Sequence, residues 1–556
     1  MKRALTLLLL TAVLAACGAA TPLPPTAAPT AEPSTATPTA TPAPAAKAGP
    51  WWRDTVFYEV FVRSFYDSDG DGVGDLPGLL EKLDYLNDGD PAGGPDLGVT
   101  GLWLMPVLTS PSYHGYDVVD YYTVNPDYGT NDDFRQFMDA AHARGMYIII
   151  DLVLNHTSTE HPWFVDSASG PDSERRDWYI WSDEDPGYLG PWGQEVWHPR
   201  NGAYYYGLFW SGMPDLNLEN PLVTAELEDV ARFWLEEMDV DGFRLDAARH
   251  YVEDGKIQEH TEATHQWLRD FCTFCQEVEP EMLAVAEVWD TSYAVAQYTT
   301  EDVNLAFEFS LAGSILSAVN NGRAGPLAST MREVMRLYPA GEYATFLTNH
   351  DQNRVMNQLN RDEDKARLAA TLLLTLPGVP FLYYGEEIGM VGAKPDELIR
   401  KPMQWTDGPQ GGFTEGIPWQ PLDRGFEERS VAIQSADAGS LLNHYRALIG
   451  LRNAYPALRG LSLTPVESPH QGVYAFLRGG QILVVINLEG QAAADYALQW
   501  TDEALASGNY QATSLLAPAE VAPLTVGPGG VVEGYQPLPE LPARSALVLA
   551  LAPAGE

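Results

Sequence analysis

From Trp51 onward, eight short apolar runs rich in β-formers alternate with amphipathic segments of helical period. A β–α alternation repeated eight times favours a closed parallel barrel over an open sheet. The predicted strands are Val56–Phe65, Gly101–Pro106, Met146–Asp151, Val240–Asp246, Met282–Val288, Asn304–Leu311, Ala344–Asp351 and Val379–Gly385. Helices are predicted between them, for example over Asp132–Arg144, Leu222–Met238 and Asp364–Leu374. The expected fold class is therefore α/β, a (β/α)8 barrel of the TIM type.

The spacing of the strands predicts an insertion. One β–α unit takes roughly thirty residues or more. Asp151 and Asp246 end the third and fourth predicted strands and are 95 residues apart, which is too far for one unit. The excess is rich in Trp, Tyr, Gly and Pro. We therefore expect an inserted subdomain over residues 157–221, above the mouth of a barrel made of 50–156 and 222–458.

A second module is expected after the barrel. Leu441–Tyr455 is predicted to be the last helix, and short alternating runs such as Gly472–Leu477 and Gln481–Leu488 follow it. Such alternation is typical of half-buried strands. Residues 459–556 are therefore predicted to form a C-terminal antiparallel β-sandwich.

The N-terminus has the character of an export signal. Met1–Arg3 is basic, Ala4–Ala16 is apolar but too short to span a membrane, and Leu14–Cys17 resembles a bacterial lipobox. That resemblance implies a signal peptide over 1–16 and a lipidated Cys17, so that the protein is anchored outside the cytoplasmic membrane. Residues 17–49, almost all Ala, Thr and Pro, would be a tether. The alternative is an ordinary cleaved signal with an incidental Cys.

Charge narrows the possible partners. Asp and Glu number 76 against 33 Lys and Arg, a formal net charge of −43. A surface this acidic repels nucleic acid and anionic lipid and disfavours anionic substrates. Contact with a membrane is therefore expected only through the lipid anchor, and the oligomeric state is left open.

Cys272 and Cys275 stand in a CxxC spacing on a predicted helix. This spacing is compatible with a disulfide or a metal site, but it is weak evidence for either. Two packed thiols are the favoured interpretation.

Four segments carry polar side chains where predicted strands end: DLVLNH, GFRLDAARH, AEVW and LTNHD, at 151–156, 242–250, 286–289 and 347–351. Active sites of parallel barrels lie at the carboxyl ends of the strands. Three carboxylates, Asp246, Glu287 and Asp351, are therefore expected to meet there.

Asp246 and Glu287 end adjacent strands, the fourth and fifth, and can face each other. A nucleophile and an acid/base roughly 5–5.5 Å apart make a retaining glycosidase. Arg244, two residues before Asp246 on the same strand face, can keep Asp246 ionised. Glu287 needs a raised pKa to act as an acid. Asp351 would stabilise the positive charge of the transition state.

The four segments resemble the signature regions of the alpha-amylase family, glycoside hydrolase family 13, and the resemblance covers the chain from Trp51 to the C-terminus. It implies that Asp246 is the nucleophile, Glu287 the acid/base and Asp351 the transition-state stabiliser. Tyr113–Asp117 resembles the family's loop after the second strand, where the Tyr stacks on the sugar at subsite −1. The substrate-binding residues implied are His114, Tyr116, Asp117, His156, Arg244, Arg249, His250, His350, Arg354 and Arg400. The alternative is a catalytically inactive protein of this fold that only binds maltodextrin, but this chain retains all three carboxylates.

An acidic loop follows the first predicted strand, with Asp67, Asp69, Asp71, Val73 and Asp75 at alternate positions. Carboxylates in a Gly-rich turn suit Ca²⁺, although the twelfth position, Gly78, excludes an EF-hand. The loop resembles the metal loop of oligosaccharide-acting members of the family, which implies a Ca²⁺ cofactor bound partly by the Val73 carbonyl. The alternative is a solvated acidic loop. The family's other calcium site would use Asn155, with partners that the sequence does not identify.

The substrate class follows from smaller features. Met213–Asn217 (MPDLN) resembles a group of the family between oligo-1,6-glucosidases and neopullulanases. Ala247 after the nucleophile, and Arg249–His250 in place of a Lys-His pair at subsite +2, favour endo-hydrolysis of α-1,4 bonds in starch or maltodextrin.

The pair Asp117 and Arg400 supports a different specificity. Both match residues that exo-acting α-glucosidases use to hold a non-reducing end. If the pair closes, the chain would be an α-glucosidase or a maltogenic or transglycosylating enzyme on malto-oligosaccharides. An ordinary surface ion pair is the plain interpretation of Arg400.

Overall fold

The computed structural model describes residues 50–90, 94–338 and 341–554. The predicted signal peptide, the lipidated Cys17 and the 17–49 tether lie outside these residues. Within the described ranges, the helices are all too short or too polar to cross a lipid bilayer.

Eight strands close into a barrel, and every neighbouring pair is parallel. In barrel order from β1, through its neighbour β2, they are β1 (Phe57–Val60), β2 (Gly101–Leu104), β5 (Tyr147–Leu152), β9 (Gly242–Leu245), β10 (Leu283–Ala286), β11 (Leu305–Phe307), β12 (Tyr343–Thr345) and β13 (Val379–Tyr383). The predicted (β/α)8 barrel is confirmed. Most strands are shorter than predicted because the polar residues at the ends of the predicted runs lie outside the hydrogen-bonded sheet. After β12, for example, Asp351 donates its N–H to the Asn349 side chain at 3.1 Å.

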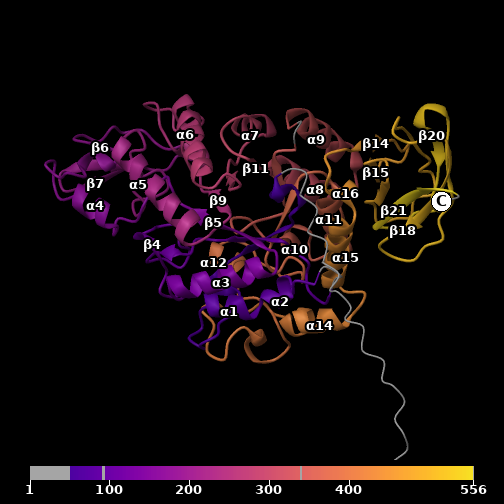
Figure 1. The fold of residues 1–556 in the computed structure, drawn as a ribbon, viewed down its shortest axis with the longest axis horizontal. Coiled ribbons are helices and arrows are strands. Elements are labelled where there is room, and N and C mark those ends of the chain that lie inside the picture. Colours follow the sequence, from indigo (N-terminus) through magenta and orange to yellow (C-terminus); the bar gives the residue numbers. More distant parts are fainter. Residues whose placement is uncertain (1–49, 91–93, 339–340, 555–556) are drawn as a thin grey trace, which may run out of the picture. The chain divides into compact units, whose positions relative to one another are not determined.

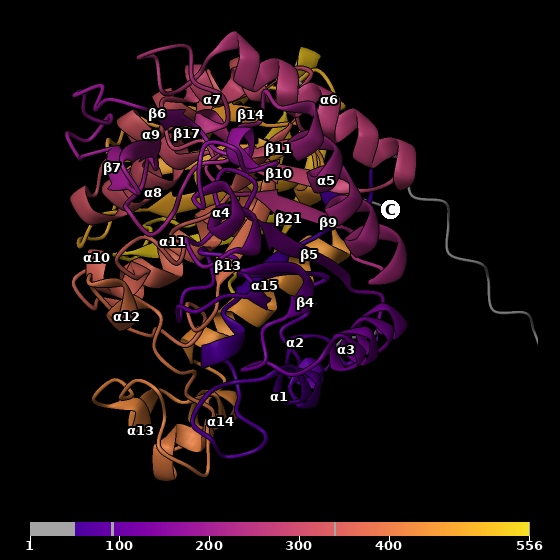
Figure 2. The same ribbon diagram turned by 90° about the vertical axis from the view of Figure 1, so that its left-hand side faces the viewer.

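Helices lie outside the strands, as Figure 2 shows for α3, α5 and α6 beside β5, β9 and β10. Their bounds are α1 (Leu76–Glu81), α2 (Leu83–Leu86), α3 (Asn131–Ala143), α5 (Pro221–Arg232), α6 (Glu262–Val278), α7 (Ser292–Tyr298), α8 (Phe309–Asn321), α9 (Ala324–Leu337), α10 (Val355–Gln358), α11 (Glu363–Thr375), α12 (Asp396–Ile399), α13 (Phe426–Arg429), α14 (Val431–Ala436), α15 (Leu441–Ala454) and α16 (Pro456–Arg459). Local signals explain where they begin: Thr130 and Asp133 form a capping box on α3, and Asp362 caps α11.

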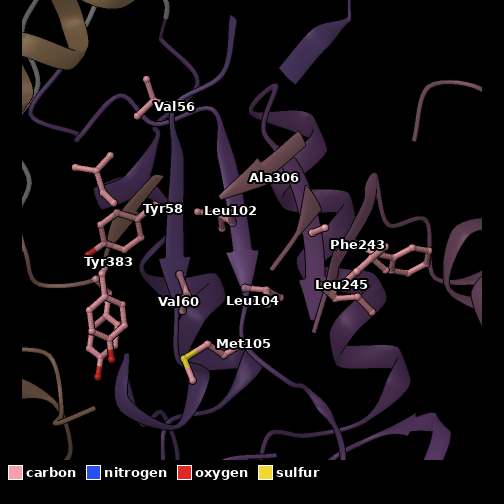
Figure 3. Packing of buried hydrophobic residues seen from close by; sticks show 14 of the residues in the cluster. Val56, Tyr58, Val60, Leu102, Leu104, Met105, Phe243, Leu245, Ala306 and Tyr383 are labelled. Atoms are coloured by element: carbon pink, nitrogen blue, oxygen red, sulfur yellow. The ribbon is translucent and has the colours of Figure 1, made fainter. Parts of the chain in front are cut away.

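Side chains alternate between the two faces of each strand, and this sets the site. Phe57, Trp103 and Ile149 point into the barrel and share one core. Their neighbours on the other face, including Tyr58, Leu102 and Phe243, pack beneath the helices, and Figure 3 shows part of that layer. A period of two then turns the residues two places after Phe57 on β1 and Ile149 on β5 into the barrel as well.

The segment between β5 and α5 forms a small antiparallel unit. It contains α4 (Pro162–Ser167) and a three-stranded sheet in the order β6 (Trp181–Ser182), β8 (Ala203–Tyr206), β7 (Trp197–Arg200). The unit carries the labels α4, β6 and β7 in Figure 1, and Phe164 of α4 stacks on Trp181 of β6 with ring centroids 5.8 Å apart. An isolated bridge from His156 to Asp215 joins its end to the loop after β5. A hairpin of β3 (Leu108–Thr109) and β4 (Asp120–Val124) follows β2.

The C-terminal strands form two antiparallel sheets. One has the order β14 (Thr464–Val466), β15 (Val473–Arg478), β16 (Ile482–Asn487), β21 (Ser545–Pro553), β18 (Gly508–Ser514), β19 (Leu524–Val526), and the other pairs β17 (Leu498–Thr501) with β20 (Val531–Tyr535). Leu483 and Trp500 from the two sheets share one core. The predicted antiparallel C-terminal module is confirmed.

Cys272 and Cys275 are buried in α6 and are not bonded to each other. Burial raises the pKa of both thiols, Cys272 to about 12. The interpretation as packed thiols is therefore confirmed.

Candidate active site

Five acidic residues meet at the carboxyl ends of the barrel strands. Glu59 on β1 and Asp151 on β5 lie two residues after the inward-facing Phe57 and Ile149. Asp246 and Glu287 directly follow β9 and β10, and Asp351 follows β12 in the next loop. The structure thus brings the three predicted carboxylates to one place and adds Glu59 and Asp151.

Arg244 is the centre of this cluster. It is fully buried, at 0% exposure, on β9. Its Nη1 donates to Asp151 Oδ1 and to Asp246 Oδ1, each at 2.6 Å, and its Nη2 donates to Glu287 Oε2 at 2.7 Å. Three carboxylates therefore share one guanidinium.

Sharing one cation affects the protonation of these acids. Burial raises the pKa of Glu287 and of Asp246, while the positive charge of Arg244 opposes the rise in both. Burial also raises the pKa of Asp151, to about 7, although the charge of Arg244 again opposes the rise. The expected rise at Glu287 is found. At Asp246, burial and the nearby charge of Asp351 raise the pKa, and the charge of Arg244 opposes this rise and favours the ionised carboxylate, as predicted.

The turn after β9 fixes the position of Glu287. Ala247 has a left-handed backbone, with φ of 50°, and its N–H donates to Glu287 Oε2 at 3.2 Å. Backbone in this region is uncommon outside glycine and costs free energy, so its presence beside the carboxylates marks a constrained site.

His350 and Asp351 form an ion pair on the other side of the cluster. His350 Nδ1 bonds to Glu59, and Nε2 lies 3.2 Å from Asp351 Oδ2. Burial would lower the pKa of His350, but the charges of Asp351 and Glu59 raise it to about 9. Burial likewise would raise the pKa of Asp351, but His350 and Arg400 hold it well below its usual range. Asp351 is therefore ionised, whereas the pKa of Glu287 is shifted in the opposite direction.

Tyr116, His114 and His156 lie beside the carboxylates. The Tyr116 hydroxyl donates to Asp151 Oδ2 at 3.0 Å and lies 2.6 Å from His350 Nε2. The ring of His114 stacks on that of Tyr116, with centroids 6.1 Å apart. His156 Nε2 lies 3.1 Å from the Tyr116 carbonyl oxygen, and burial lowers the pKa of His156 to about 4, so it is neutral.

Asp117 and Arg400 are not paired with each other in the described structure, in contrast to the arrangement considered from the sequence. Arg400 Nη2 donates to Asp351 Oδ1 at 2.9 Å, and its Nε donates to the His350 carbonyl at 3.0 Å. Asp117 Oδ1 accepts from the Ser110 hydroxyl at 2.6 Å and from the Ser112 hydroxyl. Arg400 is only 3% exposed, so the plain interpretation as a surface ion pair is also wrong.

Arg249 and His250 continue the site next to Glu287. Arg249 Nη1 donates to the Trp289 carbonyl at 2.7 Å, and its Nε lies 3.0 Å from His250 Nε2. His250 Nδ1 lies 2.8 Å from the Gln258 carbonyl, and burial lowers the pKa of His250 to about 4.

Arg354 is placed differently from the other predicted substrate-binding residues. Its guanidinium donates to the carbonyls of Tyr384 at 2.6 Å and Ile399 at 2.8 Å and lies against the Tyr383 ring. Its side chain is 2% exposed. These contacts hold backbone in place and do not join Arg354 to the carboxylate cluster.

The acidic loop after β1 brings three carboxylates together. Oxygen atoms of Asp67, Asp69 and Asp71 lie within 4.8 Å of one another. Burial raises the pKa of Asp71, and the neighbouring Asp69 and Asp67 add to the rise. Asp75 is engaged elsewhere, since its Oδ1 accepts the Gly78 N–H at 2.6 Å and caps α1. The donor set of the first three fits a hard cation.

Four residues of the site were not predicted from the sequence: Glu59, Asp151, Ser110 and Ser112. For Glu59 and Asp151 a signal existed: each interrupts an apolar strand in the same phase as the inward-facing residues. For Ser110 and Ser112 no comparable signal exists, because their bonds to Asp117 depend on the course of the loop after β3.

Comparison with known proteins gives a consistent result. The family profile described as alpha amylase, catalytic domain, matches residues 59–460. The chain is 42% identical to "Alpha-amylase 3" of Dictyoglomus thermophilum over 449 residues, covering 79% of this chain and 85% of that protein. It is 31% identical to an oligo-1,6-glucosidase of Halalkalibacterium halodurans over 520 residues, covering 79% and 91%. The crystal structure of an alpha-amylase from H. orenii superposes with a TM-score of 0.78 at 41% identity, covering 90% of this chain and 99% of that one.

A closed parallel barrel that gathers carboxylates around an arginine at its strand ends, together with these relatives, defines the protein as a glycoside hydrolase. More particularly, the chain belongs to the alpha-amylase family.

The charge of His350 predicts a loss of stability at alkaline pH. Because its folded pKa of about 9 lies above the ordinary 6.5, it contributes stability that is present below pH 6.5 and lost as pH rises through 9. The loss is up to about 3 kcal/mol, at about 1.4 kcal/mol per pH unit. Denaturant unfolding from pH 6 to 10 should show this slope in the wild type and a flatter one in His350→Gln. His444→Gln is the control, since burial lowers the pKa of His444 to about 4 and keeps it neutral throughout. Equal slopes in wild type and His350→Gln would contradict the charge assignment.

Proposed function

We propose that this protein hydrolyses internal α-1,4-glucosidic bonds of starch and maltodextrin with retention of anomeric configuration. The observation that carries the proposal is the binding of Asp246 and Glu287 to the two terminal nitrogens of one guanidinium. Two carboxylates held this closely suit the roughly 5–5.5 Å separation of a retaining pair better than the wider separation that an inverting enzyme needs.

In the first step, Asp246 attacks the anomeric carbon and Glu287 protonates the departing glycosidic oxygen. In the second, Glu287 takes a proton from water, and the water oxygen displaces Asp246 from the sugar. The raised pKa of Glu287 supports its role as an acid. The depressed pKa of Asp351 supports its role as a fixed negative charge beside the oxocarbenium-like transition state. Asp246 attacks as the carboxylate, the form that the positive charge of Arg244 favours against burial.

Internal cleavage is proposed because, among the described residues, Asp117 and Arg400 form no hydrogen bond or ion pair with each other. Each side chain has other partners, the two serine hydroxyls and Asp351. A closed pair would hold a terminal glucosyl unit, whereas separated side chains leave room for the chain to continue.

The test is hydrolysis of maltoheptaose blocked at its non-reducing end. An endo-acting enzyme releases shorter blocked products from it, and we expect a rate comparable to that on the unblocked sugar. An enzyme idle on the blocked sugar but active on the free one would instead be the exo-acting α-glucosidase or maltogenic enzyme. That alternative draws on the similarity to an oligo-1,6-glucosidase and a probable alpha-glucosidase.

We further propose that Asp67, Asp69 and Asp71 bind Ca²⁺, with the Val73 carbonyl as a further ligand. The ion would neutralise three clustered carboxylates and fix the loop after β1. Chelation is expected to lower the melting temperature by several degrees, and Asp69→Ala to remove that effect. Asp172→Ala, an exposed carboxylate in the inserted unit, is the control and should remain sensitive to chelation. A melting temperature that does not change after exhaustive chelation would argue against the site.

A further inference from the structure

Exposed aromatic side chains of the described residues are confined to two segments. Trp192 and Trp210 belong to the inserted unit and are 54% and 51% exposed, and Trp289 and Tyr293 follow β10 and are 46% and 65% exposed. Contiguous exposed apolar patches are uncommon on soluble proteins and mark binding surfaces. The remainder of the described surface carries isolated aliphatic residues instead.

The two tryptophans of the inserted unit are held in place. Trp192 sits in a tight turn in which Gly190 N donates to the Gln194 carbonyl at 2.8 Å. The Gln194 side chain accepts the Trp192 N–H at 3.0 Å and donates to the Leu208 carbonyl at 3.0 Å. The ring is therefore presented on a fixed backbone, and little conformational entropy remains to be lost when it binds a ligand.

Trp210 lies flat against a glycine. A Cβ on Gly212 would fall 2.2 Å from Trp210 Cζ2, so only glycine at this position permits the ring to lie there. The Met213 N–H donates to the Trp210 carbonyl at 3.0 Å, and the Thr159 N–H donates to the Gly212 carbonyl at 3.0 Å. The half-exposed Trp210 ring is therefore packed against a hydrogen-bonded turn.

Aromatic contacts connect this surface to the candidate active site. The Trp192 ring lies 5.6 Å from that of His250 and 5.7 Å from that of Phe209. Phe209 in turn lies 5.3 Å from His156. His250 contacts Arg249, which donates to the Trp289 carbonyl, two residues from Glu287. The surface therefore continues the site on the side of the proposed proton donor, where the leaving part of the substrate lies.

We propose that Trp192 and Trp210 form a platform for an α-1,4-glucan chain on the leaving-group side, several glucosyl units beyond the bond that is cut. The C–H face of a pyranose is apolar and stacks on an indole ring, while the hydroxyl groups at its edges stay hydrated. A neutral polymer is the suitable occupant because the chain carries a net charge of −43, which disfavours anionic ligands. This inference rests on the proposed function, and it implies that the enzyme prefers long glucan chains to short ones.

The test separates long from short substrates. In Trp192→Ala and Trp210→Ala, kcat/KM on starch and maltoheptaose is expected to fall about five- to tenfold for each ring lost, as one stacking contact is worth about 1 kcal/mol. Turnover of maltotriose should be unchanged, and Trp192→Phe should retain most of the activity on long chains. Val531→Ala, an exposed residue on β20 of the C-terminal module, is the control.

Binding is measured separately in the Glu287→Gln background by titration with maltoheptaose. Weaker binding on adding Trp192→Ala or Trp210→Ala, with the melting temperature and oligomeric state unchanged, supports the platform. Equal affinities and equal kcat/KM on starch in all variants would overturn it, as would a change in oligomeric state without a change in affinity. If the wild type neither binds nor cleaves any α-1,4-glucan, the proposed function itself fails.

Discussion

Glu287→Gln is expected to reduce the release of reducing ends from starch by about 10²–10⁴-fold, the usual contribution of a positioned acid/base. The amide keeps the size of the side chain and can still accept from Ala247 N–H, but it cannot give a proton to the leaving oxygen or take one from water. Binding of maltoheptaose should be retained, because the change removes a transition-state interaction and not a ground-state one. The measurement is kcat and KM by reducing-sugar assay, with binding by calorimetry.

Glu277→Gln on the exposed face of α6 is the matched control and should behave as the wild type. The pH profile supplies a second readout. Because Glu287→Gln lacks the acid with the raised pKa, its remaining activity should not show the alkaline limb of the wild-type pH–rate profile. A Glu287→Gln variant that hydrolyses starch within a factor of a few of the wild type would contradict the assignment of Glu287.

Arg244→Leu is expected to destabilise the protein by about 3–5 kcal/mol and to abolish hydrolysis. The substitution removes the only cation that Asp151, Asp246 and Glu287 share among their hydrogen bonds in the described structure, and leaves three acids buried together. Their pKa values rise further, so the folded variant binds more protons than the unfolded chain. Its stability should therefore increase as pH falls from 8 to 5.

Urea unfolding at several pH values measures this effect. Arg135→Leu on α3 is the control, since Arg135 is 42% exposed, and its surface ion pair with Asp132 is worth at most about 1 kcal/mol. If Arg244→Leu unfolded at the same urea concentration as the wild type, Arg244 would not be the common counter-ion of the cluster.

Much of this arrangement could be predicted from the sequence because it follows from periodicity. The alternation of strands and helices predicts the barrel. Polar residues at the ends of apolar runs predict that Asp246, Glu287 and Asp351 belong to the site. The same reasoning, applied to strand phase, would have added Glu59 and Asp151, whose side chains face inward with Phe57 and Ile149.

The remainder depends on contacts between separate loops, which carry no local signal. The sequence places Arg244 two residues before Asp246, but it does not show that the guanidinium also serves Asp151 and Glu287. It suggests that Asp117 and Arg400 could meet, whereas the loop after β3 supplies serine hydroxyls to Asp117. Side-chain partners of this kind are decided by tertiary packing.

Covalent labelling tests the central claim most directly. A fluorinated α-glucosyl fluoride, in which the electron-withdrawing fluorine slows hydrolysis of the glycosyl-enzyme, should trap the intermediate of the wild-type protein. Digestion and mass spectrometry are expected to find the added sugar on the peptide that contains Asp246, and on no peptide of Asp246→Asn. A label on Glu287 or Asp351, or continued turnover of the reagent with no label on any peptide, would contradict a retaining mechanism with Asp246 as its nucleophile.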